Sequence, residues 1–243
     1  MKKSILQELV KKIGVIEPIN EPLTYKLVVD SGDITIPFIN NSSNIKGYVK
    51  SSNFELENCE VCICDAKLFG KTLSKLNEDI KLSIDDEMIT IKDDKYTLKY
   101  YLMDEATILH RENLEECFMF DEDDWDATII FDKTFIDDFL SMSSNEKYEF
   151  QDTFVLKYNA KKDNFVINLG KKVKVKFTID GTKHNDNNVD SILRVQDFVN
   201  IFNANKDCQE SYLYLSDGVI RLEFTNSNDI KSVYNICSEE NEH

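Results

Sequence analysis

Four segments of the chain carry apolar residues at helical spacing, with polar residues on the opposite side. An apolar pair opens each apolar face, and the pairs begin at residues 5, 68, 135 and 198. In the second segment the face is expected to hold Leu68, Phe69, Leu73 and Leu76. The pattern predicts four short amphipathic helices, over Ser4–Ile13, Ala66–Leu76, Thr134–Met142 and Val195–Asn203.

The segments between these helices read as strands, because β-branched and aromatic residues alternate with polar ones. Turn sequences such as Ser31-Gly32-Asp33 and Ser216-Asp217-Gly218 separate them and indicate hairpins, so the sheets should be mostly antiparallel. Asp65 and Asp132 stand where they could cap the second and third helices. The expected strands are Thr24–Val29, Ile34–Ile39, Ile45–Lys50, Glu60–Cys64, Lys81–Ile84, Met88–Lys92, Tyr96–Met103, Thr128–Phe131, Thr153–Tyr158, Asn164–Leu169, Lys172–Ile179, Ser211–Leu215, Val219–Thr225 and Ser232–Cys237.

The helices recur at intervals of 63, 67 and 63 residues. Equal outer intervals predict two similar halves, each built from two similar units of a helix followed by strands. The alternative is chance spacing in a β-rich α+β protein.

Charge divides the chain in the same way. The formal net charge is -16, and between Arg111 and Asp126 one basic residue stands against eight acidic ones. An acidic run of this kind is typical of a solvated linker. We therefore expect one domain over 1–110, an acidic linker over 111–126 and a second domain over 127–243.

Composition and hydropathy indicate in which cellular compartment the protein is expected. A hydrophobic fraction of 42% supports packed cores. No run approaches about 18 apolar residues, and polar residues interrupt the N-terminal segment too early for a signal peptide, so neither a membrane span nor export is expected. The protein is predicted to be cytoplasmic, or nuclear where the cell has a nucleus.

The sequence offers little support for a catalytic function. Cys59, Cys62 and Cys64 lie in an expected strand with no histidine nearby, which favours reduced core cysteines over a metal site. Mg²⁺ ligands in a nuclease usually come from separate elements, whereas the acids of the linker are contiguous. Phosphate loops, zinc motifs and nucleophile triads are not apparent in the sequence. We expect no catalytic residue, no metal and no cofactor. The acids weighed for such a site are Asp121, Glu122, Asp123, Asp124 and Asp126.

Two passages carry a resemblance to a known family. The strand-to-helix passage Phe54–Leu76, with its continuation Asn77–Ile84, resembles that of the DNA polymerase sliding clamp (processivity factor) of large tailed phages. In the second half, Lys174–Ile179 and the helix around Phe198 look like the matching passage. This family is related in plan to proliferating cell nuclear antigen. The resemblance implies an α+β fold of two tandem DNA-clamp domains, each with two short helices on antiparallel sheets, assembling into a ring.

The resemblance also implies a function. Such a clamp encircles duplex DNA and tethers the replicative DNA polymerase, which confers processivity without any bond chemistry. It is a homotrimer whose ring closes by pairing an edge strand of one subunit with an edge strand of the next. The implied partners are double-stranded DNA, a DNA polymerase, a clamp loader and further copies of the chain. Because similar phage clamps also serve transcription, the transcription machinery is a further candidate.

In this family the helices line the hole, so lysines on their polar faces should meet phosphates. Lys67, Lys71 and Lys75 form a stripe at i, i+4 and i+8, although lysine is also the common solvated residue of any amphipathic helix. The third helix instead shows Asp137 and Asp138, so DNA contact is expected mainly in the first domain. The candidate DNA-binding residues are Lys3, Lys11, Lys12, Lys67, Lys71, Lys75, Lys133, Arg194 and Lys206.

Clamp partners dock near the interdomain linker and the C-terminal segment, where this chain holds apolar residues that either line a pocket or tuck against the core. The rival hypothesis is an acidic, non-catalytic interaction protein, such as a DNA mimic or a viral structural β-protein. It explains the charge but neither the repeated helices nor the lysine stripe. The candidate partner-binding residues are Leu114, Phe118, Phe120, Val233, Tyr234 and Ile236.

Overall fold

The computed structural model describes residues 2–14, 24–40, 42–52, 54, 56–108, 111–120, 125–144, 152–169 and 175–238. The start of the expected strand 172–179 and the acids Asp121–Asp124 lie outside these residues. The chain divides into two compact units. The first comprises Met1–Phe118 with Asn228–Ser232, and the second comprises Met119–Ser227 with Val233–His243.

All four predicted helices are present, and their starts keep the predicted spacing to within one residue. They are α1 (Lys3–Ile13), α2 (Ala66–Leu73), α3 (Lys133–Ser143) and α4 (Val195–Ala204). The predicted caps are confirmed. The Asp65 carboxylate accepts the Leu68 N–H at 2.8 Å, and the Asp132 carboxylate accepts the Phe135 N–H at 3.0 Å. Each unit therefore contains two short capped or amphipathic helices.

The structure corrects two details of α2. It ends at Leu73 rather than Leu76, because the N–H groups of Lys75 and Leu76 bond only three residues back, as Lys75 N–H does to Thr72 O at 3.3 Å. Leu68 does not belong to the buried face and is 51% exposed. Phe69 and Leu73 fill the core one turn apart, so the neighbouring position is rotated by about 100° into solvent.

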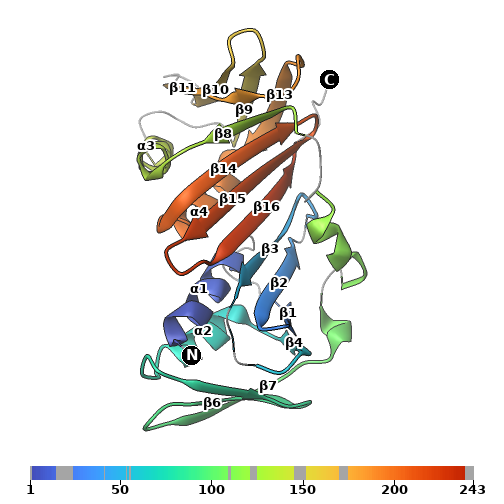
Figure 1. Cartoon of the computed structure of the whole chain (residues 1–243), viewed down its shortest axis with the longest axis vertical. Helices are drawn as coiled ribbons and strands as arrows, with labels where there is room; N and C mark the ends of the chain where they lie inside the picture. Colours follow the sequence, from blue (N-terminus) through green and yellow to red (C-terminus); the bar gives the residue numbers. More distant parts are fainter. Residues whose placement is uncertain are drawn as a thin grey trace. The chain divides into compact units, whose positions relative to one another are not determined.

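Three-stranded meanders follow the helices of the first unit. The strands are β1 (Tyr25–Asp30), β2 (Asp33–Ile39), β3 (Ile45–Ser51), β4 (Cys59–Ile63), β5 (Lys81–Ile84), β6 (Met88–Lys92) and β7 (Thr97–Tyr101). They pair antiparallel in the orders β3-β2-β1-β4 and β5-β6-β7. In Figure 1, α1 and α2 lie side by side, and α1 also packs on β2 and β3. Two 3-10 segments, η1 (Glu105–Thr107) and η2 (Arg111–Phe118), complete the unit.

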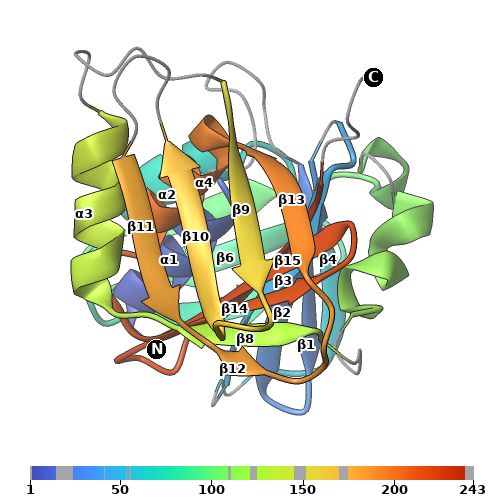
Figure 2. The same cartoon turned by 90° about the horizontal axis from the view of Figure 1, so that it is seen from above.

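The second unit repeats this plan. Its strands are β8 (Ala127–Ile130), β9 (Thr153–Asn159), β10 (Asn164–Leu169), β11 (Val175–Asp180), β12 (Thr182–Lys183), β13 (Val189–Arg194), β14 (Cys208–Ser216), β15 (Val219–Asn226) and β16 (Lys231–Cys237). One sheet has the order β11-β10-β9-β13, which Figure 2 shows side by side, and the other contains the order β12-β8-β14-β15-β16. The short β12 and the longer β13 were not predicted. The predicted fold class, two short helices on antiparallel sheets in each half, is confirmed.

The units share a pattern of strand exchange. The strands β4, β8 and β13 lead into α2, α3 and α4, respectively. Each pairs with the first strand of the three-stranded meander that follows the other helix of its unit. Thus β4 pairs with β1, β13 with β9 and β8 with β14. The corresponding place beside β5 in the first unit holds only an isolated bridge between Lys2 and Asp79 among the described residues. The two units are therefore similar but not equivalent.

Aromatic side chains dominate the core of the second unit. Phe139 of α3 is fully buried, and its ring centroid lies 5.1 Å from that of Phe202 and 6.0 Å from that of Phe198 on α4. In the first unit the Phe69 ring meets Tyr100 edge-on at 5.0 Å. Edge-to-face pairs of this kind hold a helix against both its neighbour and the sheet.

Candidate nucleic-acid interface

The helix pair of the first unit buries its apolar stripes and turns lysines outward. Lys11 on α1, Lys71 on α2 and Lys75 just beyond α2 are exposed. Within the described part of the chain, none of the three forms an ion pair. Lys67, the first member of the predicted stripe, is partly buried and makes its own contacts. The helix pair of the first unit thus presents three cations whose charge no described neighbour neutralises.

The other predicted lysines of this unit have intramolecular roles. Lys3 donates its Nζ to the Leu76 carbonyl at 2.8 Å. The structure corrects the expected placement of Lys12. Its side chain is 1% exposed and its Nζ lies 3.9 Å from the Glu8 carboxylate. A buried ammonium beside its own counter-ion does not reach a phosphate in this conformation, so Lys12 is not carried into the proposal below.

The helix pair of the second unit differs in charge. Lys133 at the start of α3 is held by Asp137 at 2.6 Å, and Asp138 is exposed beside it. On α4 the polar face carries amides, with Gln196 donating to Asn200 at 2.7 Å. Exposed Arg194 and Lys206 lie only at the two ends of α4. The described surfaces of α3 and α4 therefore offer no unpaired lysine between their ends.

The linker candidates fall on η2 and the residues after it. Cys117 is fully buried and its thiol donates to the Phe38 carbonyl at 3.2 Å. Burial raises the pKa of this thiol to about 11. Phe118 stacks on Tyr48 with centroids 4.8 Å apart, yet 39% of Phe118 stays exposed, and Leu114 is partly buried. Apolar residues of this segment were expected either to pack against the core or to line a binding surface. Cys117 packs against the core, whereas Phe118 leaves an aromatic face exposed to solvent.

In the second unit, the Arg221 guanidinium holds the segment that follows. It donates to the Phe120 carbonyl at 3.1 Å and pairs with Glu223 at 3.2 Å. Met119 is 56% exposed, whereas Phe120 is partly buried near Trp125. In the first unit, the exposed part of the Phe118 ring remains as an apolar surface.

The C-terminal candidates are buried. Val233 and Tyr234 are 0% exposed and Ile236 is 1% exposed, because all three side chains fill the core beneath β16. Of the two alternatives for these apolar residues, all three are therefore tucked against the core.

Among the described residues, no group of three or more His, Cys, Asp or Glu side chains is arranged to hold a metal ion. Asp126, one of the acids weighed as a ligand, is buried and accepts the amides of Asn185 and Asn187. In the same part of the chain, every helix is too short or too polar to cross a bilayer. Cys62 is buried, whereas Cys59 and Cys64 are only partly covered.

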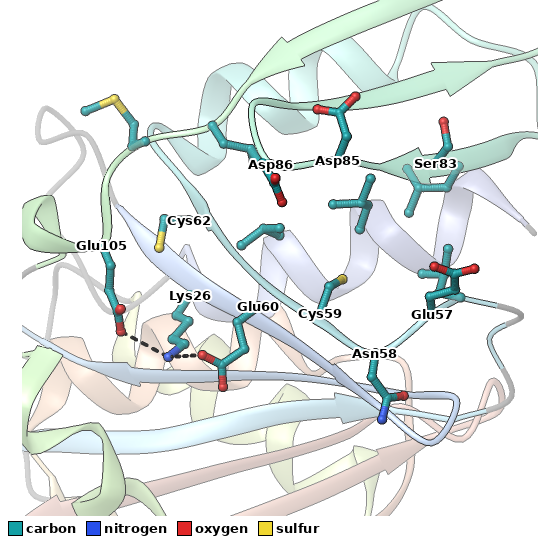
Figure 3. A pocket seen from close by; sticks show the side chains of 16 residues that line it. Lys26, Glu57, Asn58, Cys59, Glu60, Cys62, Ser83, Asp85, Asp86 and Glu105 are labelled. Atoms are coloured by element: carbon teal, nitrogen blue, oxygen red, sulfur yellow. Dashed lines mark hydrogen bonds and ion pairs between the residues drawn. The ribbon is translucent and has the colours of Figure 1, made fainter.

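Sequence reasoning missed one concave feature. A groove of about 720 Å³ opens between β4 and the β5–β6 hairpin of the first unit (Figure 3). Lys26 projects into it and contacts Glu60 at 2.6 Å and Glu105 at 3.0 Å. The Asp85-Asp86 pair in the hairpin turn was the sequence signal that could have pointed to this groove. A turn sequence alone does not reveal which strand edge the turn faces.

No protein-family model and no curated protein sequence matches this chain. Solved structures do. The PCNA of A. fulgidus, in a structure with the C-terminal region of FEN-1 bound, superimposes with a TM-score of 0.79 at 14% identity, covering 100% of this chain and 98% of that one. The proliferating cellular nuclear antigen of Entamoeba histolytica gives 0.72 at 14% identity, covering 98% and 96%. The chain has the fold of a PCNA-type clamp over its whole length.

Proposed function

We propose that this chain is one subunit of a sliding clamp that encircles duplex DNA and tethers a replicative DNA polymerase. The observation that carries the proposal is the clamp fold combined with exposed Lys11, Lys71 and Lys75 on the helix pair of the first unit. Lysines aimed at phosphates hold a duplex without reading its sequence, as sliding requires. The domain boundaries proposed from the sequence are 1–110 and 127–243, with 111–126 as linker.

We infer that the ring is a homotrimer closed through β7 and β11. Each is the last strand of its sheet among the described residues. Tyr101 on β7 is 68% exposed, which is a large apolar area for an edge strand. Exposed Lys99 on β7 offers a partner of opposite charge for exposed Asp180 on β11, a strand that also carries exposed Lys176. Antiparallel pairing of β7 with β11 of the next copy would cover both edges in one contact.

Partners would dock on the exposed aromatic face of Phe118 in the first unit. We propose a DNA polymerase, a clamp loader and, by resemblance to clamps of large tailed phages, the transcription machinery as its occupants, in the cytoplasm of a host cell. Aromatic anchors such as Phe118 typically dominate the affinity for a short peptide. The clamp itself would carry out no reaction and use no cofactor.

Light scattering after size exclusion tests the ring directly. A trimer has about three times the chain mass of 28.2 kDa. Tyr101→Asp places a charge in the proposed β7–β11 contact and should yield monomers, whereas Ile130→Asp, at a site 69% exposed on β8, should leave the trimer intact. The trimer should also be retained on a nicked circular plasmid after loading and be released when the plasmid is cut.

A strict monomer at micromolar concentration, with no stimulation of a polymerase from the same genome, would exclude the clamp. That result would favour the second candidate, an acidic interaction protein. Its supporting observation is the acidic surface of α3, where Asp137 and Asp138 are exposed, in a chain of net charge -16. A DNA mimic would displace DNA from a DNA-binding protein as a monomer, whereas a clamp would not.

A further inference from the structure

The repeated topology leaves one strand position of the first unit unfilled by the residues that the structure describes. In the second unit, β8 covers the outer edge of β14, with Ile130 opposite Tyr212 and Ala127 opposite Leu215. The strand β5 follows α2 as β14 follows α4, so its outer edge is the equivalent place. Among the described residues, only the bridge from Lys2 to Asp79 approaches that edge, just before β5 begins.

The backbone of β5 is poised to accept a strand. The Glu78 carbonyl accepts the Lys3 N–H at 2.8 Å on the outer side, whereas Asp85 donates its N–H to the Met88 carbonyl at 3.1 Å on the inner side. Alternate residues of an antiparallel strand direct both backbone groups to the same side. Leu82 and Ile84 therefore turn their N–H and C=O groups toward the open edge.

This edge forms one side of the groove between β4 and the β5–β6 hairpin. On the opposite side, the Cys62 carbonyl faces outward, since it accepts the Met103 N–H at 3.0 Å. By the same alternation Glu60 turns its backbone outward as well. Apolar side chains from both sides also line the groove, among them Val61, Leu82, Ile84 and Leu102. Two strand edges and an apolar lining suit an extended peptide.

The charge of the groove indicates which kind of peptide it would bind. Carboxylates of Glu57, Glu60, Asp85, Asp86 and Glu105 line it. Its single lysine, Lys26, is already held between Glu60 and Glu105. Glu57 and Asp86 are exposed, so their charges face whatever enters. An acidic groove attracts basic segments and repels acidic ones, including the surfaces of other copies of this acidic chain.

We propose that this groove binds an extended basic segment of a partner protein, which adds to β5 as a further strand. The backbone of β5 supplies hydrogen bonds, the apolar lining takes alternate side chains, and the carboxylates pair with lysine or arginine on the others. The site lies wholly within the first unit and involves none of the lysines assigned to DNA. It depends on neither the ring nor the proposed function.

A fluorescein-labelled peptide in which Lys alternates with Ile or Val is a suitable probe, with fluorescence anisotropy as the readout. The paired variant Glu57→Gln with Asp86→Asn should weaken its binding roughly two- to fivefold for each charge removed. The matched control, Glu115→Gln with Asp217→Asn, removes the same charge from exposed positions outside the groove and should leave the Kd unchanged. Methylating alternate backbone nitrogens of the peptide should abolish binding, because it blocks strand pairing.

Hydrogen exchange followed by NMR locates the contact. Added peptide should protect the amides of Leu82 and Ile84, which face the open edge, more than that of Ser83, which already faces β6. Equal loss of binding in both charge variants would mean non-specific attraction to an acidic protein and would overturn the proposal. So would binding that leaves the Leu82 and Ile84 amides unprotected, or peptide-driven dissociation of the chain's own oligomer, which would make a second copy the occupant.

Discussion

Replacing Lys71 and Lys75 by Gln should weaken DNA binding and flatten its dependence on salt. Both side chains are exposed, and neither forms an ion pair with a described residue. Each is therefore available to neutralise a phosphate and to release the cation condensed on it, which is the origin of the salt dependence. Glutamine keeps the length and helix propensity of the side chain while removing the charge.

The size of the effect follows from counting charges. Each phosphate contact contributes about 0.9 to the slope of log Kobs against log salt concentration. The double variant removes two lysines from one chain and six from a homotrimer. If one subunit engages the duplex at a time the slope should fall by about 2, and if all three engage it by about 5.

A salt titration of a short labelled duplex, followed by fluorescence anisotropy between about 50 and 200 mM salt, measures this slope. The matched control is Lys133→Gln. Because the Lys133 ammonium already pairs with Asp137 at 2.6 Å, a contact between Lys133 and a phosphate would contribute little to DNA binding. Its slope should stay close to that of the unaltered protein. A slope unchanged by the Lys71 and Lys75 substitutions, or lowered equally by Lys133→Gln, would refute the assignment of DNA contact to the first unit.

Three further outcomes follow from the packing and the pKa values. Phe139→Ala should lower the free energy of unfolding in urea by about 3–5 kcal/mol, because this ring is fully buried among phenylalanines, and a loss below about 1 kcal/mol would contradict that core. Cys117, with its pKa raised to about 11 by burial, should resist iodoacetamide at about pH 8 while partly exposed Cys208 is alkylated, as mass spectrometry would show. Hydrogen bonds from Ser4 lower the pKa of Glu78 below its ordinary 4.5, so its hold on the start of α1 should be complete above that pH and be lost as the pH falls through the lowered value. Hydrogen exchange at the Ser4 amide checks this, and Glu78→Gln should remove the pH dependence.

The helices could be predicted because several signals agreed at each one. Around α3, the Asp132 cap, the apolar spacing of Phe135 and Phe139 and the strand before it all point to the same boundaries. Local agreement of this kind specifies an element without knowledge of its neighbours. The even recurrence of such elements then predicted the pair of helices in each half.

What failed depended on neighbours that the sequence does not reveal. The strand β13 escaped notice because its inward-facing positions include Ser191, which is 0% exposed, so the apolar alternation was broken. Lys12 was expected on the polar side of α1, but it is buried beside Glu8. The groove could not be predicted either, since it arises where the second unit has a strand pairing that the described residues of the first unit do not form. Each failure concerns tertiary burial rather than local propensity.

The unequal charge of the two helix pairs bears on how the proposed ring would move. Unpaired lysines lie on the helices of the first unit, whereas α3 carries Asp137 and Asp138. In a trimer, positive and neutral or acidic arcs would then alternate around the duplex. Each arc with lysines would hold phosphates only briefly, because the neighbouring arc would offer no equivalent contact and would repel the backbone. Since topology rather than affinity would keep the ring on DNA, this thin lining would lower the barrier to sliding without raising the rate of escape.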